Sequence, residues 1–225
     1  MTRLILVRHG ESQVTVDRIV GGPRTCYGLS DLGREQAARL RDRWTASPEF
    51  VPDLVVASHY PRARETAEIV SPAFGDVTIV TDPGFGEHDP GPDCDGLTYD
   101  EFVEHFQPEP DAWHDDDPFG APYPGGETVA EFHLRVGTAL RALLRAHPDA
   151  ATIVIFCHGG VVDAVFRQSL KTATNGVFQI ATMNAAISEF ELIKRNYWRL
   201  VRQNDHAHLA GLPTASPASA ARPRR

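Results

Sequence analysis

The chain has 225 residues, of which 42% are hydrophobic and 23% are charged, and its formal net charge is −8. This length and composition are typical of one globular α/β domain with a sizeable core, and exclude a collagen-like, wholly disordered or small disulfide-stapled protein. Its apolar stretches, such as 4–7 and 153–157, are far shorter than the ~18 residues of a membrane span, and the N-terminal residues lack the pattern of a signal peptide. The three cysteines are far apart and fit reduced thiols, so we expect a cytoplasmic protein that does not associate with a membrane.

Strand and helix patterns alternate through the first half of the chain. Ser30 or Asp31 is a suitable N-cap for a helix, and Pro61 stands where proline is favoured, in the first turn of another. The expected elements are a strand at 3–7, a helix from residue 30 or 31 to about 44, a strand at 53–58, a helix from 61 to 70, a strand at 77–81, a loop rich in Gly, Pro and Asp at 83–96, a short helix at 99–106 and a second loop at 108–126.

The second half of the chain continues this alternation. The expected elements are an amphipathic helix at 127–146, a strand with apolar residues on both faces at 152–157, a helix at 161–170 and an edge hairpin at 186–193 and 198–202. The alternation predicts an α/β fold with a doubly wound, mostly parallel central sheet and helices on both faces, in three layers. We expect one domain over residues 1–204 and a disordered tail over 205–225, because the end of the chain is rich in Pro, Ala, Ser and Arg.

The charged residues are unevenly distributed. The 70 residues between Arg64 and Arg135 contain 18 acidic residues and no Lys or Arg. Such a stretch is most often a solvated surface. The chain has no basic stripe with a nucleic-acid-binding motif and no set of Cys and His at metal-ligand spacing, so we expect neither a nucleic-acid partner nor a bound metal.

Polar residues at the ends of predicted strands are the candidates for chemistry. His9 follows the first strand and His158 follows the strand at 152–157, and each is followed by glycine. Ligands of open α/β sheets bind at the carboxyl ends of the strands, so we expect the two histidines to face each other across one crevice. A lone histidine there is more often structural, but a pair at two strand ends, joined by Arg62 after a third strand, favours a functional site.

This set of motifs resembles the histidine phosphatase superfamily, branch 1, over residues 3–203. The motifs are LVRHGES at 6–12, GLSDLGREQA at 28–37, RARETA at 62–67, the acidic residue Glu87, PGGET at 124–128 and CHGGV at 157–161. The resemblance implies a three-layer, phosphoglycerate mutase-like fold and an enzyme that needs no cofactor. It implies a small-molecule phosphate ester as the partner and leaves a homodimer open.

The residue types of the predicted site suit phosphoryl transfer. A neutral imidazole nitrogen of His9 can attack phosphorus and form a phosphohistidine, which divides one difficult displacement into two easier ones. Arg8, Arg62 and protonated His158 would surround the phosphoryl group and stabilise its equatorial oxygens. The planar guanidinium group can hold two phosphate oxygens at once.

Glu87 is the predicted general acid and base. It would protonate the leaving oxygen and then activate the water that hydrolyses the phosphohistidine, and Asp89 is the second choice for this role. The backbone amide of Gly159 and the hydroxyl of Thr15, which aligns where many relatives have Asn, complete the predicted phosphate-binding set. The loop at 91–96 departs from the family pattern by one extra residue and lacks an aromatic side chain, which affects the pocket for the leaving group.

These features predict a metal-independent phosphatase that hydrolyses a small-molecule phosphomonoester through a phosphohistidine. The alternatives are a phosphoglycerate-type phosphomutase and a non-catalytic module that binds phosphorylated ligands. True phosphoglycerate mutases carry an extra substrate-binding segment between the positions that resemble Glu87 and His158. The stretch between these two residues is short here, so the resemblance favours a phosphatase over a mutase. In this family the chain after the third strand covers the pocket, so the resemblance implies an acidic rim and a neutral or cationic leaving group, unless the acidic residues all face bulk water.

Overall fold

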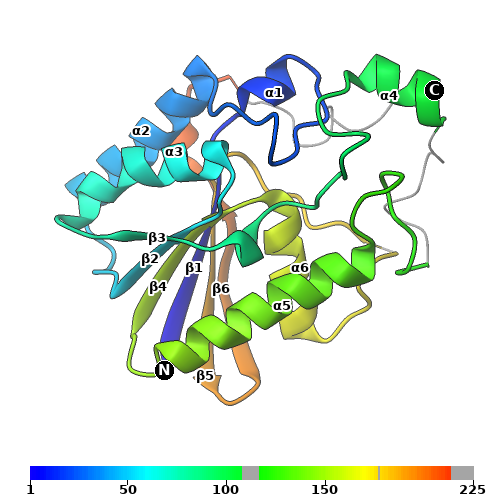
Figure 1. The fold of residues 1–225 in the computed structure, drawn as a ribbon. Helices are drawn as coiled ribbons and strands as arrows, with labels where there is room; N and C mark the ends of the chain where they lie inside the picture. Colours follow the sequence, from blue (N-terminus) through cyan, green and yellow to red (C-terminus); the bar gives the residue numbers. More distant parts are fainter. Residues whose placement is uncertain (108–116, 177, 214–225) are drawn as a thin grey trace.

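Six strands form one central sheet in the order β3-β2-β4-β1-β5-β6 (Figure 1). The computed structural model describes residues 1–107, 117–176 and 178–213. The pairs β1–β4, β4–β2 and β2–β3 are parallel, and β1–β5 and β5–β6 are antiparallel, which confirms the predicted mostly parallel sheet. The strands are β1 (Thr2–Arg8), β2 (Leu54–Ala57), β3 (Ile79–Thr81), β4 (Thr152–Cys157), β5 (Ile187–Lys194) and β6 (Tyr197–Asp205).

Helices cover both faces of this sheet and give the predicted three layers. The α-helices are α1 (Gln13–Val16), α2 (Asp31–Ala46), α3 (Pro61–Val70), α4 (Tyr99–Phe106), α5 (Val129–Ala146) and α6 (Gly159–Leu170), and the 3₁₀ helices are η1 (Ser71–Phe74), η2 (Pro83–Phe85) and η3 (Ala207–Leu209). Within the described residues, no helix is both long enough and apolar enough to cross a membrane.

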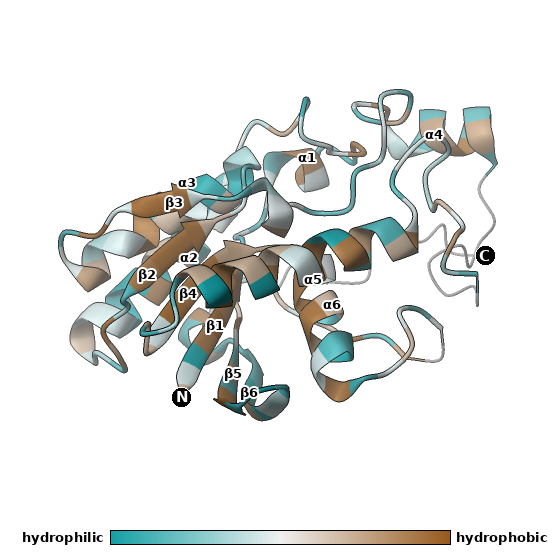
Figure 2. Ribbon diagram, turned by 60° about the horizontal axis from the view of Figure 1, so that its bottom comes forward, coloured by the Kyte–Doolittle hydropathy of each residue, from teal (hydrophilic) through white to brown (hydrophobic). Residues whose placement is uncertain are grey.

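Successive residues of the central strands supply two separate cores. Leu4 and Leu6 of β1 pack with α5 and α6, whereas Ile5 and Val7 pack with α2 and α3. This two-residue alternation is the ordinary geometry of a strand buried on both faces. Figure 2 shows the hydrophobic colouring concentrated in the strands between the two helical layers.

A third, small apolar cluster lies apart from the two main cores. It contains Val20, Cys94 and Phe102, with Tyr99 and Tyr123 packed against it. Figure 1 shows α1 and α4, the helices of this region, beyond the carboxyl ends of the strands. The chain thus covers the edge of the sheet at which the site residues were expected.

Two helix boundaries differ from the sequence prediction for local reasons. The long helix α5 begins at Val129, because Thr128 and Glu131 form a reciprocal capping box in which each side chain accepts from the other's backbone N–H. The helix α6 begins at Gly159, directly after His158, which is its N-cap. The first turn of α6, where a helix leaves backbone N–H groups without partners in the turn before, therefore lies beside the predicted site.

The described fold extends past the predicted domain end at residue 204. Asp205 forms an ion pair with Arg43 of α2, with Nη2 and Oδ2 2.8 Å apart. Leu209 is buried, and η3 packs against α2. The expectation of a tail from residue 205 is therefore wrong for 205–213, where β6 ends at Asp205 and η3 packs against α2. Residues 214–225, and 108–116 of the second predicted loop, lie outside the described residues.

Candidate active site

The loop after β1 holds His9 through its backbone. The His9 N–H donates to the carbonyl of Cys157 at 2.9 Å, and its carbonyl accepts from the side-chain amide of Asn184 at 3.1 Å. The next residue, Gly10, lies so close to α2 that a Cβ on it would be 2.4 Å from the carbonyl oxygen of Gly33. The close approach requires glycine here and leaves His9 in one backbone position.

One hydrogen bond assigns the tautomer of His9. Its Nδ1 lies 2.6 Å from the carbonyl oxygen of Gly10, so Nδ1 carries the proton and donates it. The other nitrogen, Nε2, therefore carries a lone pair, which accepts from Nε of Arg62 at 3.1 Å. His9 thus presents an unprotonated nitrogen to the cavity.

His158 presents a second lone pair to the same guanidinium group. Its Nδ1 accepts from Nε of Arg62 at 3.3 Å, and its Nε2 lies 2.8 Å from Oγ of the fully buried Ser58. The two imidazole rings are 5.0 Å apart between centroids. One Arg62 atom therefore contacts both histidines, which places all three groups around one point.

Contacts with α3 and with the loop at Gly21 fix the position of the Arg62 side chain. Pro61 opens α3 and puts Arg62 in the first turn, where the guanidinium lies 4.5 Å from the centroid of the Tyr60 ring. Its Nη1 donates to the carbonyl of Gly21 at 3.2 Å. The side chain is therefore fixed by a ring contact and a hydrogen bond as well as by the two histidines.

Burial keeps both histidines uncharged. It lowers the pKa of His9 well below 6.5, and the positive charges of Arg62 and Arg8 lower it further. The pKa of His158 is also lowered, by burial first and then by Arg62 and His9. At neutral pH the site thus holds neutral imidazoles beside two guanidinium groups, and a bound phosphate dianion would offset that positive charge.

Arg8 and Gly159 complete the basic end of the cavity. Arg8 is the last residue of β1, and its Nη1 donates to the carbonyl of Thr182. Its Nε is buried in the cavity wall and has no hydrogen-bond partner among the described residues. A buried unpaired donor is costly, so an anionic ligand is the expected partner of this N–H. Gly159 lines the same cavity at the first turn of α6.

The structure distinguishes between the two candidate acids. Glu87 lines the cavity, where its Oε2 accepts from the N–H of Gly160 at 3.2 Å. A Cβ on Gly160 would lie 2.3 Å from Oε1 of Glu87, so a larger residue here would displace this carboxyl group from its present position. Asp89 is exposed and does not line the cavity, and its carboxylate accepts from the N–H of Gly91 at 2.9 Å. Of the two, only Glu87 lines the cavity.

Thr15 and the loop at 91–96 have different positions. Thr15 lines the cavity, and its hydroxyl pairs with Oγ of Ser12 at 2.8 Å. In the loop, the buried carboxylate of Asp95 accepts from the N–H of Gly22 at 2.9 Å and from the hydroxyl of Thr25. The loop at 91–96 therefore holds the segment at 22–25 in place through Asp95, and none of its acidic residues lines the cavity.

The acidic residues between Arg64 and Arg135 do not form the expected rim. Of those the structure describes, only Glu87 lines the cavity. Others act elsewhere: Glu101 closes a capping box on α4, and Glu127 pairs with Arg135 at 2.7 Å. Among the described residues, the lining of the cavity therefore lacks the predicted acidic rim, and some of these carboxylates, such as Glu101 and Glu127, cap a helix or pair with an arginine instead.

The cavity has a volume of about 490 Å³ and extends well beyond the phosphate-sized space around His9. Its outer part includes Tyr99, Tyr123, Asp163 and Arg167, which the sequence analysis did not single out. The i,i+4 spacing of Asp163 and Arg167 would have indicated an ion pair, but not its place in a cavity. In the described ranges, no group of three His, Cys, Asp or Glu residues has the arrangement of a metal site.

Comparisons with known proteins agree with this geometry. A model of the histidine phosphatase superfamily (branch 1) matches residues 4–206. The chain is 30% identical over 207 residues to phosphoglycerate mutase-like protein 4 of Arabidopsis thaliana, covering 92% of this chain and 86% of that protein. It is 28% identical over 211 residues to the uncharacterized phosphatase PhoE of Bacillus subtilis, covering 94% and 98%. Among solved structures, a mycobacterial glucosyl-3-phosphoglycerate phosphatase complex with VO3 superposes with a TM-score of 0.75 at 25% identity, covering 91% and 99%. The chain therefore belongs to the histidine phosphatase superfamily, branch 1.

Proposed function

We propose that the protein is a phosphatase that hydrolyses a small-molecule phosphate monoester through a phosphohistidine on His9. The observation that carries the proposal is the convergence of Nε2 of His9 and Nδ1 of His158 on one nitrogen of Arg62, at 3.1 and 3.3 Å. A phosphoryl group between the imidazoles would meet a nucleophile, a second imidazole and a guanidinium at once. The phosphatase names of two relatives support the hydrolytic reading.

In the first step, the lone pair on Nε2 of His9 forms a bond to phosphorus. The bond between phosphorus and the leaving oxygen breaks, and protonated Glu87 transfers its proton to that oxygen, so that a neutral alcohol leaves. Arg8 and Arg62 stabilise the charge on the equatorial oxygens. The N–H of Arg8 that lacks a partner gains one in this state.

In the second step, a water molecule attacks the phosphohistidine from the side that the alcohol has left. The carboxylate of Glu87 takes the proton of the water, a bond forms between the water oxygen and phosphorus, and the bond from phosphorus to Nε2 of His9 breaks. Inorganic phosphate leaves, and His9 and Glu87 return to their starting protonation states. The same carboxyl group thus serves both steps.

His158 assists through its protonation state. With a phosphate dianion bound, Nδ1 of His158 gains a proton and donates it to a phosphate oxygen, while Nε2–H donates to Oγ of Ser58. The dianion offsets the neighbouring guanidinium charges that lower the pKa of His158 in the free protein.

The test is to trap the intermediate. Purified protein is mixed with a phosphate monoester carrying ³²P and quenched during turnover, and acid-labile, alkali-stable label on His9 is expected by mass spectrometry. His147→Ala is the matched control, since His147 is an exposed residue after the last turn of α5, and it should retain the label. Hydrolysis without label on His9, or no hydrolysis of any ester in a broad panel, would overturn the proposal.

A further inference from the structure

The cavity continues from the phosphate-binding residues into what we call the outer chamber. Among its lining residues, Val20, Tyr99, Tyr123 and Phe132 form the set that we call the aromatic wall. The set that we call the polar wall consists of Asp163, Arg167, Asn175 and Gln179. When the phosphoryl group of a substrate lies next to His9, the leaving group of that substrate would occupy this chamber. The residues that line the chamber would therefore select the substrate.

The aromatic wall is apolar and carries no charge. Val20, Tyr99 and Tyr123 belong to the small apolar cluster of this region, and the Tyr123 ring lies 5.3 Å from that of Phe102. Burial raises the pKa of both Tyr99 and Tyr123, so their hydroxyl groups stay protonated. Such a wall favours contact with a ring or another apolar face.

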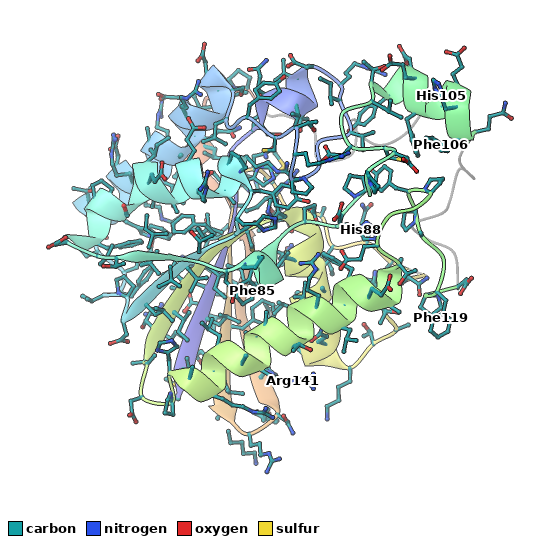
Figure 3. The ribbon with its side chains drawn as sticks, viewed as in Figure 1. Phe85, His88, His105, Phe106, Phe119 and Arg141 are labelled. Atoms are coloured by element: carbon teal, nitrogen blue, oxygen red, sulfur yellow. The ribbon has the colours of Figure 1, made fainter. Side chains whose placement is uncertain are left out.

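His88 extends this wall without adding charge. It lies in the loop after η2, between α4 and α5 in the view of Figure 3. Its ring is 5.5 Å from that of Phe132 and 6.2 Å from that of Tyr123. Burial lowers the pKa of His88 to about 4, so the imidazole is neutral at physiological pH. The wall thus consists of uncharged rings.

The charges on the polar wall cancel each other. Nε of Arg167 donates to Oδ2 of Asp163 at 2.6 Å, and its two terminal nitrogens donate to the carbonyl oxygens of Ala173 and Phe178. The other oxygen of Asp163 accepts from the N–H of Ile180 at 3.3 Å. The Arg167 side chain is only 5% exposed. Neither partner therefore has a charge available for a ligand.

Beyond this pair, the polar wall offers uncharged groups. Asn175 and Gln179 can exchange hydrogen bonds with hydroxyl or amide groups. Arg18 lies over the Tyr99 ring at 6.0 Å, but it is exposed and does not line the cavity. Among the described lining residues, the outer chamber thus holds no unpaired cation and no unpaired anion.

From these contacts we infer that the substrate is a phosphate monoester of an uncharged, ring-containing alcohol. A carboxylate or second phosphate on the leaving group would lose its hydration without meeting a cation, and an ammonium group would lose it without meeting a carboxylate. A neutral ring would contact the aromatic wall and place its polar substituents against Asn175 and Gln179. This inference rests on the proposed phosphatase function and narrows the neutral or cationic leaving group expected from the sequence to a neutral one.

The test compares esters that differ only in charge. The first pair is 4-carbamoylbenzyl and 4-carboxybenzyl phosphate, which have the same shape, and the second is 4-(hydroxymethyl)benzyl and 4-(aminomethyl)benzyl phosphate. We expect the neutral ester of each pair to have a kcat/KM at least about tenfold higher, and both neutral esters to exceed glycerol phosphate. If either charged ester equals its neutral partner, the inference is overturned while the phosphatase function stands. If none is hydrolysed, here or in a broad panel, the proposed function fails and the inference fails with it.

A variant of the ion pair tests whether the chamber holds the leaving group. Asp163→Asn leaves Arg167 unpaired, so the 4-carboxybenzyl to 4-carbamoylbenzyl ratio of kcat/KM should rise about tenfold. The matched control is Glu35→Gln, which removes the same charge from the exposed i,i+4 pair of α2, where Arg39 Nε and Glu35 Oε1 are 2.8 Å apart, and should leave the ratio unchanged. Ile19→Lys, which adds a cation to the chamber lining, is a second test if Asp163→Asn does not fold by circular dichroism. An unchanged ratio in a folded variant would overturn the inference.

Discussion

The inner end and the outer chamber of one cavity differ in how they treat charge. At the inner end, the guanidinium groups of Arg8 and Arg62 lie beside neutral His9 and His158, and the buried Nε of Arg8 has no partner among the described residues. In the outer chamber the only cation of the described lining, Arg167, is paired with Asp163, and each of its two terminal nitrogens donates to a backbone carbonyl oxygen. Among the described lining residues, positive charge is thus left available only at the inner end, which in the proposed function separates recognition of the phosphate from recognition of the leaving group.

The largest effect is expected from the nucleophile of the inner end. His9→Asn should lower kcat by at least about 10⁴-fold, because it removes the covalent pathway and not one contact. The measurement is steady-state hydrolysis of 4-carbamoylbenzyl phosphate, with His147→Asn as the control at an exposed position. A His9→Asn rate within tenfold of the wild type would mean that another group attacks phosphorus.

A smaller effect is expected from Ser58, which contacts substrate only through His158. Removing its Oγ leaves the buried Nε2–H of His158 without an acceptor, which costs about 1–3 kcal/mol and disfavours the imidazolium. Ser58→Ala should therefore lower kcat by about 10- to 100-fold and lower the pKa of His158 further.

The pH profile separates this positioning role from a loss of folding. Because the reaction needs protonated His158, kcat falls as pH rises through the pKa of this residue in the complex, and a lower pKa moves that limb to lower pH. The alkaline limb of Ser58→Ala should thus shift toward acid, whereas a merely less stable protein would lose amplitude without a shift. Ser71→Ala, on the outer end of α3, serves as the control.

The aromatic wall of the outer chamber should have an effect that depends on the substrate. Tyr99→Ala removes a ring from this wall and should lower kcat/KM for 4-carbamoylbenzyl phosphate about tenfold, while glycerol phosphate changes less than threefold. Tyr99→Phe keeps the ring and should keep the preference. Equal losses for both esters in Tyr99→Ala would assign Tyr99 to the inner end instead.

The smallest effect is expected from metal removal. In the proposed mechanism Arg8 and Arg62 supply the positive charge at the phosphoryl group, so overnight dialysis against EDTA should leave kcat within experimental error. Activity is measured before and after dialysis, and again with Mg²⁺, Mn²⁺ or Zn²⁺ added. A loss that one of these ions restores would contradict the metal-independent mechanism.

Local sequence determined most of the fold and the inner end. The runs before Arg8 and His158 are short and apolar on both faces, and each leads into a histidine that is followed by glycine. This pattern predicts two parallel strands whose carboxyl ends meet at one edge of the sheet. The position of Arg62 could be predicted because Pro61 marks the first turn of a helix that comes after a third strand. These signals are readable because each depends on a few neighbouring residues.

Long-range contacts decided the features that the sequence left open or that were predicted wrongly. Glu87 and Asp89 are two residues apart, and only Glu87 lines the cavity, where its carboxylate accepts from the N–H of Gly160 on α6. The contact between Ser58 and His158 joins residues 100 positions apart. Neither is visible in a local pattern, since each forms only when the strands and helices pack.

The acidic segment and the outer chamber show the same limit most clearly. Counting charges between Arg64 and Arg135 suggested an acidic rim, yet only Glu87 of the described carboxylates lines the cavity, and others form caps or ion pairs such as that of Glu127. In sequence, Asp163 and Arg167 look like an ordinary surface pair. In the structure, α6 places both in the lining of the cavity, where they form an ion pair with each other. The sequence determines how many charges the chain has, whereas the tertiary structure decides which remain unpaired, because pairing depends on which groups folding brings within hydrogen-bond distance.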